Sequence, residues 1–227
     1  MLIISLHLPK TAGTSFRKSL ELQFGKLLIA DYADLPLNTP VLRRKLSALY
    51  ECVVIALRPP TNVKCIHGHF LPLKYSLVGL RRQAIFVTWL RDPVERLASQ
   101  YHYWRKSYDP RSSPTLHKRV IEENWSLEDF CCAPELRNVY AQFLWGFPLS
   151  RFDFIGITEH YEEDFRFFTR EFIGTDLPLH RENMNVEKPD AHYAWDPKLR
   201  SKIEEYHAND MALYRQALEK RLARFRP

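Results

Sequence analysis

The sequence of 227 residues contains few glycines, few cysteines and no long apolar run. Its 7 glycines and the lack of any low-complexity tract argue against long disordered segments. No stretch approaches the roughly 20 apolar residues that a membrane-spanning helix requires. The cysteines, Cys52, Cys65, Cys131 and Cys132, lack the spacing of a zinc site, and adjacent cysteines rarely bridge each other. These absences predict an ordered chain with reduced thiols, no transmembrane segment and no bound metal.

The composition is that of a globular chain with a basic surface. Hydrophobic residues make up 45% of the chain and aromatic residues 13%, enough for a full core, and we expect a single domain over residues 1–227. The net charge of +6 suits a polyanionic ligand. Because the sequence has no aromatic-basic RNA motif, zinc finger or helix-turn-helix pair, we expect no nucleic-acid partner.

The segment LHLPKTAGTSF, from Leu6 to Phe16, joins an apolar run to a sequence typical of a helix. A strand, a turn and a helix N-terminus together form an anion site, because the first N–H groups of the helix are free and the macrodipole is positive there. Gly13 allows a ligand to approach the backbone, and Lys10 supplies a positive charge. Hydroxyl groups come from Thr11, Thr14 and Ser15.

This turn therefore predicts a site for phosphate or a group of similar shape. It is not the loop of nucleoside-triphosphate enzymes, G-x-x-x-x-G-K-[ST], because Lys10 precedes Gly13 and the loop is shorter. The alternative is a surface turn in which a threonine or serine caps the helix.

A second strand–helix junction lies at residues 84–101. The run AIFVTWL is typical of a buried parallel strand, and Asp92, Pro93 and Glu95 form a strong helix start with a predicted capping box. Arg91 is thereby placed at the carboxyl edge of a strand, where open α/β sheets bind ligands and where an arginine can hold a phosphate. The alternative is an arginine paired with its own acidic neighbours. Ser99 follows about two turns along the helix.

A histidine pair follows another strand-like stretch, in Cys65-Ile66-His67-Gly68-His69-Phe70. Residues two apart in a strand point to the same face, so His67 and His69 are expected side by side. A metal pair and a structural histidine at a strand end are the alternatives. We expect His7, inside the first loop, to be structural.

The sequences PKTAGTSF and RDPVERLASQY, in this order, resemble the sulfotransferases that use 3′-phosphoadenosine 5′-phosphosulfate (PAPS). The resemblance implies that Arg91 and Ser99 bind the 3′-phosphate of PAPS and of its product, adenosine 3′,5′-bisphosphate. It implies that the first loop surrounds the 5′-phosphosulfate through Lys10, Thr11, Ala12, Gly13, Thr14 and Ser15. Lys10 would also stabilise the departing phosphate.

The triplet His67-Gly68-His69 resembles the His-Gly-His of the uronosyl 2-O-sulfotransferases, which act on heparan sulfate and related polymers. The resemblance assigns His69 as the general base and His67 as its support. It implies a hydroxylated carbohydrate acceptor and no metal. Histidine suits the role because its pKa lies near neutral pH. An acidic acceptor could bind basic residues that otherwise form a solvated face: Arg81, Arg82, Arg105, Lys106, Arg111, Lys118 and Arg119.

Two other functions fit the motifs less well. A phosphotransferase of the P-loop kinase type would require Mg²⁺ and a triphosphate-binding lysine after a second glycine. A non-catalytic module that binds nucleotides or polyanions would require no base.

The location in the cell is predicted from the N-terminus, which begins almost directly on a strand and leaves no room for a signal peptide. Animal members of the family are anchored in the Golgi, so we expect a compact cytoplasmic protein, of bacterial origin, unless the sequence is a trimmed Golgi enzyme.

Apolar runs predict strands at about 2–7, 53–57, 63–67, 84–90 and 152–159. Helical patterns predict helices from the first loop to about 25 and at 42–50, 93–106, 115–123, 127–132, 135–145, 162–172 and 196–221. Residues 108–114 are rich in helix breakers and predict a loop, either a lid or an acceptor-binding segment. Alternating strands and helices predict an α/β fold, a P-loop-like three-layer sandwich with a central, mainly parallel sheet flanked by helices.

Overall fold

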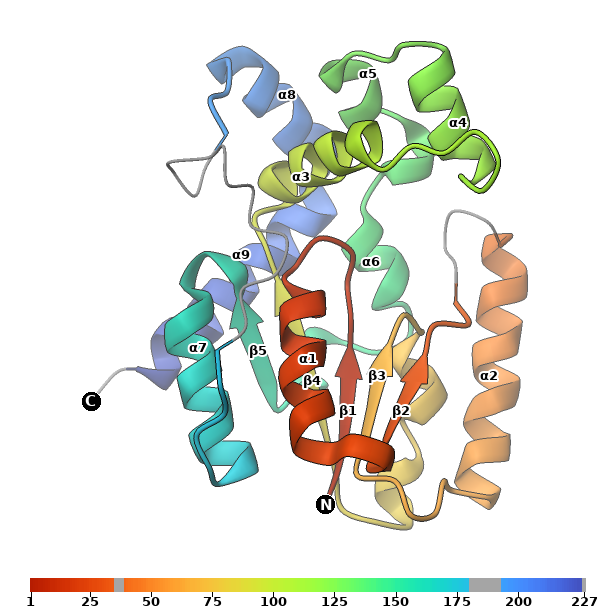
Figure 1. Cartoon of the computed structure of the whole chain (residues 1–227), viewed down its shortest axis with the longest axis vertical. Helices are drawn as coiled ribbons and strands as arrows, with labels where there is room; N and C mark the ends of the chain where they lie inside the picture. The colour runs from red at the N-terminus through yellow and green to blue at the C-terminus, as the bar shows by residue number, and fades with distance from the viewer. Residues whose placement is uncertain (35–38, 180–192, 226–227) are drawn as a thin grey trace.

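The computed structural model of the chain describes residues 1–34, 39–179 and 193–225. Five strands form one sheet in the order β2-β3-β1-β4-β5, and every pair of neighbours is parallel (Figure 1). The predicted α/β sandwich with a parallel central sheet is confirmed. The strands are β1 (Leu2–Leu6), β2 (Leu28–Asp31), β3 (Cys65–Gly68), β4 (Ala84–Leu90) and β5 (Phe154–Ile157).

Helices surround the sheet on both faces and at its carboxyl edge (Figure 1). The α-helices are α1 (Gly13–Phe24), α2 (Val41–Leu57), α3 (Pro93–Lys106), α4 (Thr115–Glu122), α5 (Leu127–Cys131), α6 (Val139–Phe143), α7 (Tyr161–Phe168), α8 (Pro197–Tyr206) and α9 (Ala208–Arg224). A π-helical turn, Thr169–Ile173, extends α7. Short 3₁₀ turns are Gly25–Leu27, Pro72–Tyr75, Val78–Leu80, Pro134–Leu136, Leu149–Arg151 and Thr158–His160.

The central strand β1 is buried on both faces, so its side chains alternate between two apolar layers. Ile3 joins Phe16 of α1 and Phe165 of α7 on one face. Ile4 joins the opposite layer, which includes Tyr140 of α6 and residues of α9. A third cluster links α3, α4, α5 and α8 above the carboxyl ends of the strands, where Figure 1 shows these helices as a cap.

The region of residues 26–62 differs from the prediction. The expected strand at 53–57 is wrong, because these residues continue α2, whose buried face is formed by Arg44, Ala48 and Cys52. The β-branched run in this segment lies partly on the exposed side of the helix. The strand that completes the sheet is β2, a short edge strand with only partly buried side chains, and no apolar alternation marks it in the sequence.

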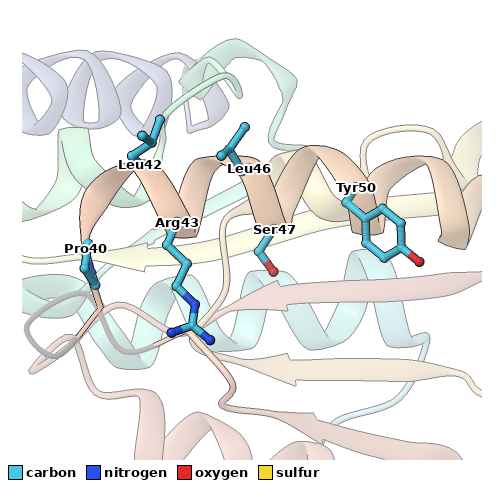
Figure 2. Close-up of a pocket in the computed structure, with 6 residues that line it drawn as sticks. All are labelled: Pro40, Leu42, Arg43, Leu46, Ser47 and Tyr50. Atoms are coloured by element: carbon cyan, nitrogen blue, oxygen red, sulfur yellow. The ribbon is translucent and has the colours of Figure 1, made fainter.

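The outer face of α2 carries a shallow hollow (Figure 2). Its lining residues are Pro40, Leu42, Arg43, Leu46, Ser47 and Tyr50. None of the predicted site residues takes part in this hollow, so it belongs to a different surface of the molecule.

Two predicted helices are interrupted. The expected helix at 135–145 is a 3₁₀ turn followed by the short α6, because Asn138 adopts a left-handed conformation between them. The expected helix at 196–221 divides into α8 and α9 at His207. The buried His207 ring accepts a hydrogen bond from the Asn138 N–H and donates one to the Cys131 carbonyl, which holds this break against the cap. The resemblance to the sulfotransferases also predicts a loop near the nucleotide at His180–Asn185, and this segment lies outside the described residues.

Most other boundaries are confirmed. Gly174 ends the α7 region in the left-handed conformation expected of a helix C-terminus, and residues 108–114 contain no helix. Within the described ranges, no helix is both long enough and apolar enough to span a bilayer.

Gly156 of β5 provides a test of the packing between the sheet and its covering layer. A Cβ at this position would lie 2.3 Å from Cε3 of Trp89, the residue paired with it on β4. Trp89 is buried, so the ring cannot move without disturbing the core. We expect Gly156→Ala to lower the free energy of unfolding by about 1–3 kcal/mol, measured by urea denaturation.

The matched control is Gly79→Ala, because a Cβ there meets no atom within 4 Å. Equal stability of the two variants would contradict the packing of Trp89 against β5.

Candidate active site

The loop between β1 and α1 is held in an unusual backbone conformation. Lys10 and Ala12 both have positive φ angles, 64° and 62°, which non-glycine residues seldom adopt. Such strain persists only where surrounding structure enforces it, and it is concentrated at functional sites. Ala12 occupies the N-cap of α1 and has no side chain that could accept a hydrogen bond from the first turn. The loop therefore presents a helix N-terminus without a side-chain cap, as an anion site requires.

The hydroxyl groups of the loop are used in different ways. Thr11 is fully buried, and its Oγ1 donates to the carbonyl of Leu8 at 2.8 Å, so this side chain fixes the loop itself. Thr14 is exposed on the first turn of α1, whereas Ser15 is buried. Of the three hydroxyls predicted to face a ligand, Thr14 has the exposure that contact with a ligand needs.

Only glycine fits at position 13, because the ring of His7 lies directly against it. A Cβ on Gly13 would lie 1.9 Å from Cδ2 and 2.0 Å from Nε2 of His7, so the imidazole covers this glycine directly. The loop and the end of β1 are thus locked together through a histidine that the sequence suggested was only structural.

Three histidines meet at the adjacent carboxyl ends of β1 and β3. The ring of His7 lies between those of His67 and His69, with centroid distances of 5.2 Å and 4.5 Å. Tyr32, just after β2, approaches the same cluster, and its hydroxyl lies 3.1 Å from Nδ1 of His7. His67 and His69 are therefore brought together as expected, but through His7 rather than by direct stacking. The sequence contained one indication that His7 belongs to this cluster: His7 stands at the end of an apolar strand, directly before the loop.

The tautomer of His69 follows from its hydrogen bond. Its Nδ1 donates to the backbone carbonyl of His7, which can only accept. Nδ1 therefore carries the proton, and the lone pair is on Nε2. Burial lowers the pKa of His69 from its ordinary value of 6.5, against smaller effects of the His7 carbonyl and Asp34, which raise it. A neutral imidazole with a lone pair on Nε2 has the form that a general base needs near pH 7.

The other two histidines are also neutral. Burial lowers the pKa of His67 to about 3, with further contributions from Arg17 and His69. Nδ1 of His67 lies 2.8 Å from the Ser5 hydroxyl, and its Nε2 is buried without a hydrogen-bond partner among the described residues. Burial likewise lowers the pKa of His7, and the neighbouring histidines add to the effect.

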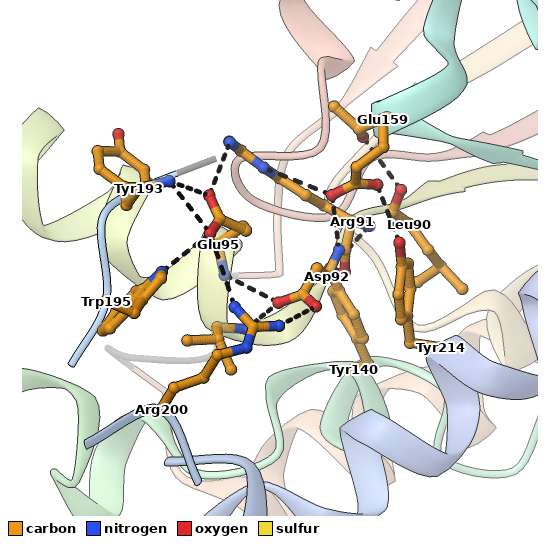
Figure 3. A network of polar contacts seen from close by, with 12 residues as sticks. Leu90, Arg91, Asp92, Glu95, Tyr140, Glu159, Tyr193, Trp195, Arg200 and Tyr214 are labelled. Carbon is orange, nitrogen blue, oxygen red and sulfur yellow. Dashed lines mark hydrogen bonds and ion pairs between the residues drawn. The ribbon is translucent and has the colours of Figure 1, made fainter. Parts of the chain in front are cut away.

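Arg91 lies at the carboxyl end of β4 (Figure 3). Because β3 and β4 flank β1 on opposite sides, Arg91 is across β1 from His67 and His69. Its backbone is fixed by the Tyr140 hydroxyl, which accepts from the Arg91 N–H at 3.1 Å and donates to the Arg91 carbonyl at 2.8 Å. Tyr140 is itself held by Asp210 of α9, whose carboxylate accepts from the backbone N–H groups of Tyr140 and Ala141. A chain of contacts thus runs from the C-terminal helix to this arginine.

The side chain of Arg91 lies loosely between two carboxylates. Among the described residues its ion pairs are with Glu95 and Glu159, each at 4.0 Å. Both carboxylates have shorter hydrogen bonds elsewhere. Glu95 accepts from the indole N–H of Trp195 at 2.9 Å, and Glu159 accepts from the Asp92 N–H at 3.0 Å. The guanidinium is oriented without being closely neutralised, so it retains capacity for another anion.

The start of α3 is capped as predicted, with one correction. Asp92 accepts from the backbone N–H groups of Val94 and Glu95. The capping box expected from Glu95 does not form: the Asp92 N–H donates to Glu159 instead, and Glu95 binds the Tyr193–Trp195 segment. Arg200 of α8 completes this network by pairing with Asp92 at 2.7 Å (Figure 3).

Ser99 is half-buried on α3, two turns beyond Arg91. Tyr193 lies beside Ser99 and forms a hydrogen bond with it. Burial raises the pKa of Tyr193, whereas the charge of Arg91 and the hydrogen bond with Ser99 act to lower it. The ring of Tyr193 also stacks on His102, with centroids 5.0 Å apart. Ser99 and Arg91 therefore border one region, and Tyr193 is a member of it that no sequence motif identified.

Lys10 and Arg91 form a pair of neighbouring cations. Burial and, to a smaller extent, the positive charge of Arg91 together lower the pKa of Lys10 to about 8. Its Nζ lies over the ring of Tyr103, 3.9 Å from the centroid. An anion bound between the two cations would relieve their repulsion and raise the pKa of Lys10. Within the part of the chain that is described, no three His, Cys, Asp or Glu side chains are grouped to hold a metal ion.

The predicted acceptor-binding cations do not form one surface. Arg82 donates to the carbonyls of Pro60 and Val63, below the amino end of β4, and so lies at the opposite edge of the sheet from the histidines. Arg105, Lys106 and Arg111 are exposed at the end of α3 and in the loop that follows.

The chain is similar in sequence to known sulfotransferases. Over 156 residues, 64% of this chain, it is 29% identical to heparan sulfate 2-O-sulfotransferase 1 of Xenopus laevis and 28% identical to that of Homo sapiens. It spans 42% of the length of these relatives. A solved structure, mouse sulfotransferase SULT7A1 complexed with PAP, has a TM-score of 0.47 and 14% identity, covering 95% of this chain and 88% of that chain. No family model matches. The resemblance predicted from the sequence motifs is confirmed by the curated relatives.

The lowered pKa of Lys10 predicts pH-dependent anion binding. Below pH 8 the ammonium is charged and attracts an anion, whereas at higher pH the free protein loses this charge and binding must take up a proton. We expect the affinity for inorganic sulfate, whose own charge is constant in this range, to fall by about tenfold or more from pH 7 to pH 10. Titration followed by NMR at constant ionic strength measures this.

Lys10→Arg is the matched control, because a guanidinium stays charged throughout and should bind sulfate equally across the range. A wild-type affinity that does not change with pH would contradict the role of Lys10 as an anion ligand.

Proposed function

We propose that the protein is a sulfotransferase that transfers a sulfuryl group from PAPS to a hydroxyl group of a carbohydrate. The observation that carries the proposal is the arrangement along three adjacent strand ends. A histidine with a lone pair on Nε2 follows β3, the uncapped loop with Lys10 follows β1, and Arg91 follows β4. The sequence similarity to sulfotransferases supports the same function.

The donor would bind through its two anionic ends. Lys10 and the first-turn N–H groups of α1 would hold the 5′-phosphosulfate, with the Thr14 hydroxyl on the same turn. Arg91 and Ser99 would hold the 3′-phosphate, for which the planar guanidinium offers two parallel hydrogen bonds. Ala12, Gly13, Thr11 and Ser15 would shape the loop around the 5′ group, since Thr11 and Gly13 have contacts that fix its backbone.

The chemistry assigned to these residues is an in-line transfer. The acceptor oxygen forms a bond to sulfur as the bond from sulfur to the bridging phosphate oxygen breaks. The hydroxyl proton moves to Nε2 of His69, and the negative charge that develops on the phosphate oxygen is stabilised by Lys10. His67 would support His69 from the strand below through the shared contact with His7. The reaction as written needs no metal.

The acceptor is proposed from the relatives, which are named for heparan sulfate. This chain spans less than half of their length. We therefore include the acceptor, and its acidic character, in the proposal. Exposed cations near the end of α3 and in the following loop would suit an acidic carbohydrate. The cytoplasmic location remains a prediction from the sequence.

The alternatives are a P-loop-type phosphotransferase and a non-catalytic nucleotide- or polyanion-binding module. The first is disfavoured because the loop has no lysine after a second glycine. The second gives no role to the neutral His69, whose Nε2 carries a lone pair.

Nucleotide selectivity tests the proposal directly. We expect adenosine 3′,5′-bisphosphate to bind without Mg²⁺ more tightly than AMP or ATP, by at least about tenfold, because only the bisphosphate fills both anion sites. Arg91→Ala should lower the affinity for the bisphosphate by about 10- to 100-fold, since a charge-assisted hydrogen bond contributes about 1.5–3 kcal/mol. The affinity for AMP should stay nearly unchanged. Titration calorimetry measures both.

Arg200→Ala is the control, because Arg200 pairs with Asp92 and Glu95 in the same network without lying at the end of β4. A preference for ATP with Mg²⁺ would favour the phosphotransferase. If Arg91→Ala lowered the affinities for AMP and for the bisphosphate equally, the assignment of Arg91 to the 3′-phosphate would be wrong.

The base is tested by His69→Asn, since the asparagine N–H₂ can still donate to the His7 carbonyl but cannot take a proton. We expect turnover to fall at least a hundredfold while the affinity for the bisphosphate stays within about twofold. In the wild type, turnover should decrease on the acid side with an apparent pKa below 6.5, because protonation of Nε2 removes the base. PAPS with desulfated heparan is the first assay.

A loss of bisphosphate binding in His69→Asn would show that the histidine is a structural residue. An acid limb centred above pH 6.5 would be inconsistent with a buried base.

A further inference from the structure

Helix α2 lies at the edge of the molecule beside β2 (Figure 1). It exposes a stripe of apolar side chains. Its members are between 47% and 71% exposed and follow one another at helical spacing: Leu42, Leu46, Leu49, Tyr50, Val53 and Leu57. The opposite face, with Arg44, Ala48 and Cys52, is buried against the body of the protein. Contiguous apolar surface of this kind marks an interaction site more often than it occurs on an isolated monomer.

The stripe has an internal symmetry. Its members lie at equal distances on either side of the bond between Leu49 and Tyr50, so that Leu42 corresponds to Leu57 and Leu46 to Val53. A two-fold axis through this bond would lay one copy of the helix antiparallel to another and bring each apolar residue opposite an apolar partner. Such self-complementarity is what an isologous dimer interface requires.

The area is sufficient for a weak association. Six side chains at this exposure offer roughly 500 Å² on each copy, so a pair would bury roughly 1,000 Å², which is near the lower limit of specific interfaces. The hollow along Leu42, Leu46 and Tyr50 gives the partner's side chains a place to enter (Figure 2).

We propose that α2 is a self-association surface, on which two copies of this chain form an antiparallel α2–α2 dimer with Leu46 of each copy against Val53 of the other. The proposal rests on α2 alone and is independent of the proposed reaction. We expect a dissociation constant on the order of 10 μM, which is typical of a weak, reversible association.

The experiment is sedimentation velocity of the full chain from about 1 to about 200 μM, a range that brackets this constant. The wild type should shift from monomer to dimer. Leu46→Glu and Val53→Lys should each remain monomeric, because each places a charge against an apolar partner. The double variant Leu46→Glu/Val53→Lys should dimerise again, since in the antiparallel pair each new carboxylate faces a new ammonium. Leu222→Glu, on α9 and similarly exposed, is the control that should dimerise like the wild type.

The orientation is tested by cysteine cross-linking under mild oxidation. Leu42→Cys/Leu57→Cys should form a covalent dimer, whereas Leu42→Cys alone should give no more than the wild type. Circular dichroism verifies that every variant is folded.

Several results would overturn the proposal. A wild type that is monomeric at every concentration, or a dimer unaffected by both single charge variants, would remove α2 as the interface. Cross-linking of Leu42→Cys alone would indicate a parallel pair. A monomer that instead binds vesicles of phosphatidylserine and phosphatidylcholine through this stripe would assign the face to a membrane surface.

Discussion

Two hydrogen bonds to the backbone of His7 hold the centre of this protein together. The His7 N–H donates to the carbonyl of Gly68 at 2.7 Å, and the His7 carbonyl accepts from Nδ1 of His69. The first extends the parallel pairing of β1 with β3, and the second sets the tautomer of the proposed base. A slip of one residue between these strands would turn every alternating side chain to the wrong face and break both bonds. The position of the loop, the histidines and Lys10 all depend on this register.

Burial separates the charges of the site into two regions. On the β3 side of β1, burial keeps His7, His67 and His69 neutral, so this side holds proton acceptors without positive charge. On the β4 side, the positive charge of Arg91 is close enough to help lower the pKa of Lys10. The nearby carboxylates of Glu95 and Glu159 do not cancel this charge at short range, because backbone and side-chain donors occupy them.

The sequence identified the two junctions but not the residues that support them. β1 and the start of α3 were predictable because a long apolar run, or a residue such as Asp92 followed by a proline, encodes them locally. Tyr140, Glu159 and Tyr193 come from distant parts of the chain, and only the tertiary fold brings them to Arg91. The edge strand β2 and the full length of α2 were missed for a related reason. β2 is half exposed, and the exposed apolar stripe of α2 includes the β-branched Val53, which is typical of a strand.

The contact chain from Asp210 through Tyr140 to Arg91 has a consequence for biosynthesis. The loop and the three histidines precede Arg91 in the chain, so their segment is synthesised before it. Arg91 follows soon after. Helix α9, whose Asp210 holds Tyr140 in place, leaves the ribosome on the order of ten seconds later, at roughly 5–20 residues per second. The nascent chain therefore carries Arg91 without the support of Tyr140 and Asp210 until α9 docks, and a chain that stalls before Asp210 would have the histidines but not a fixed Arg91.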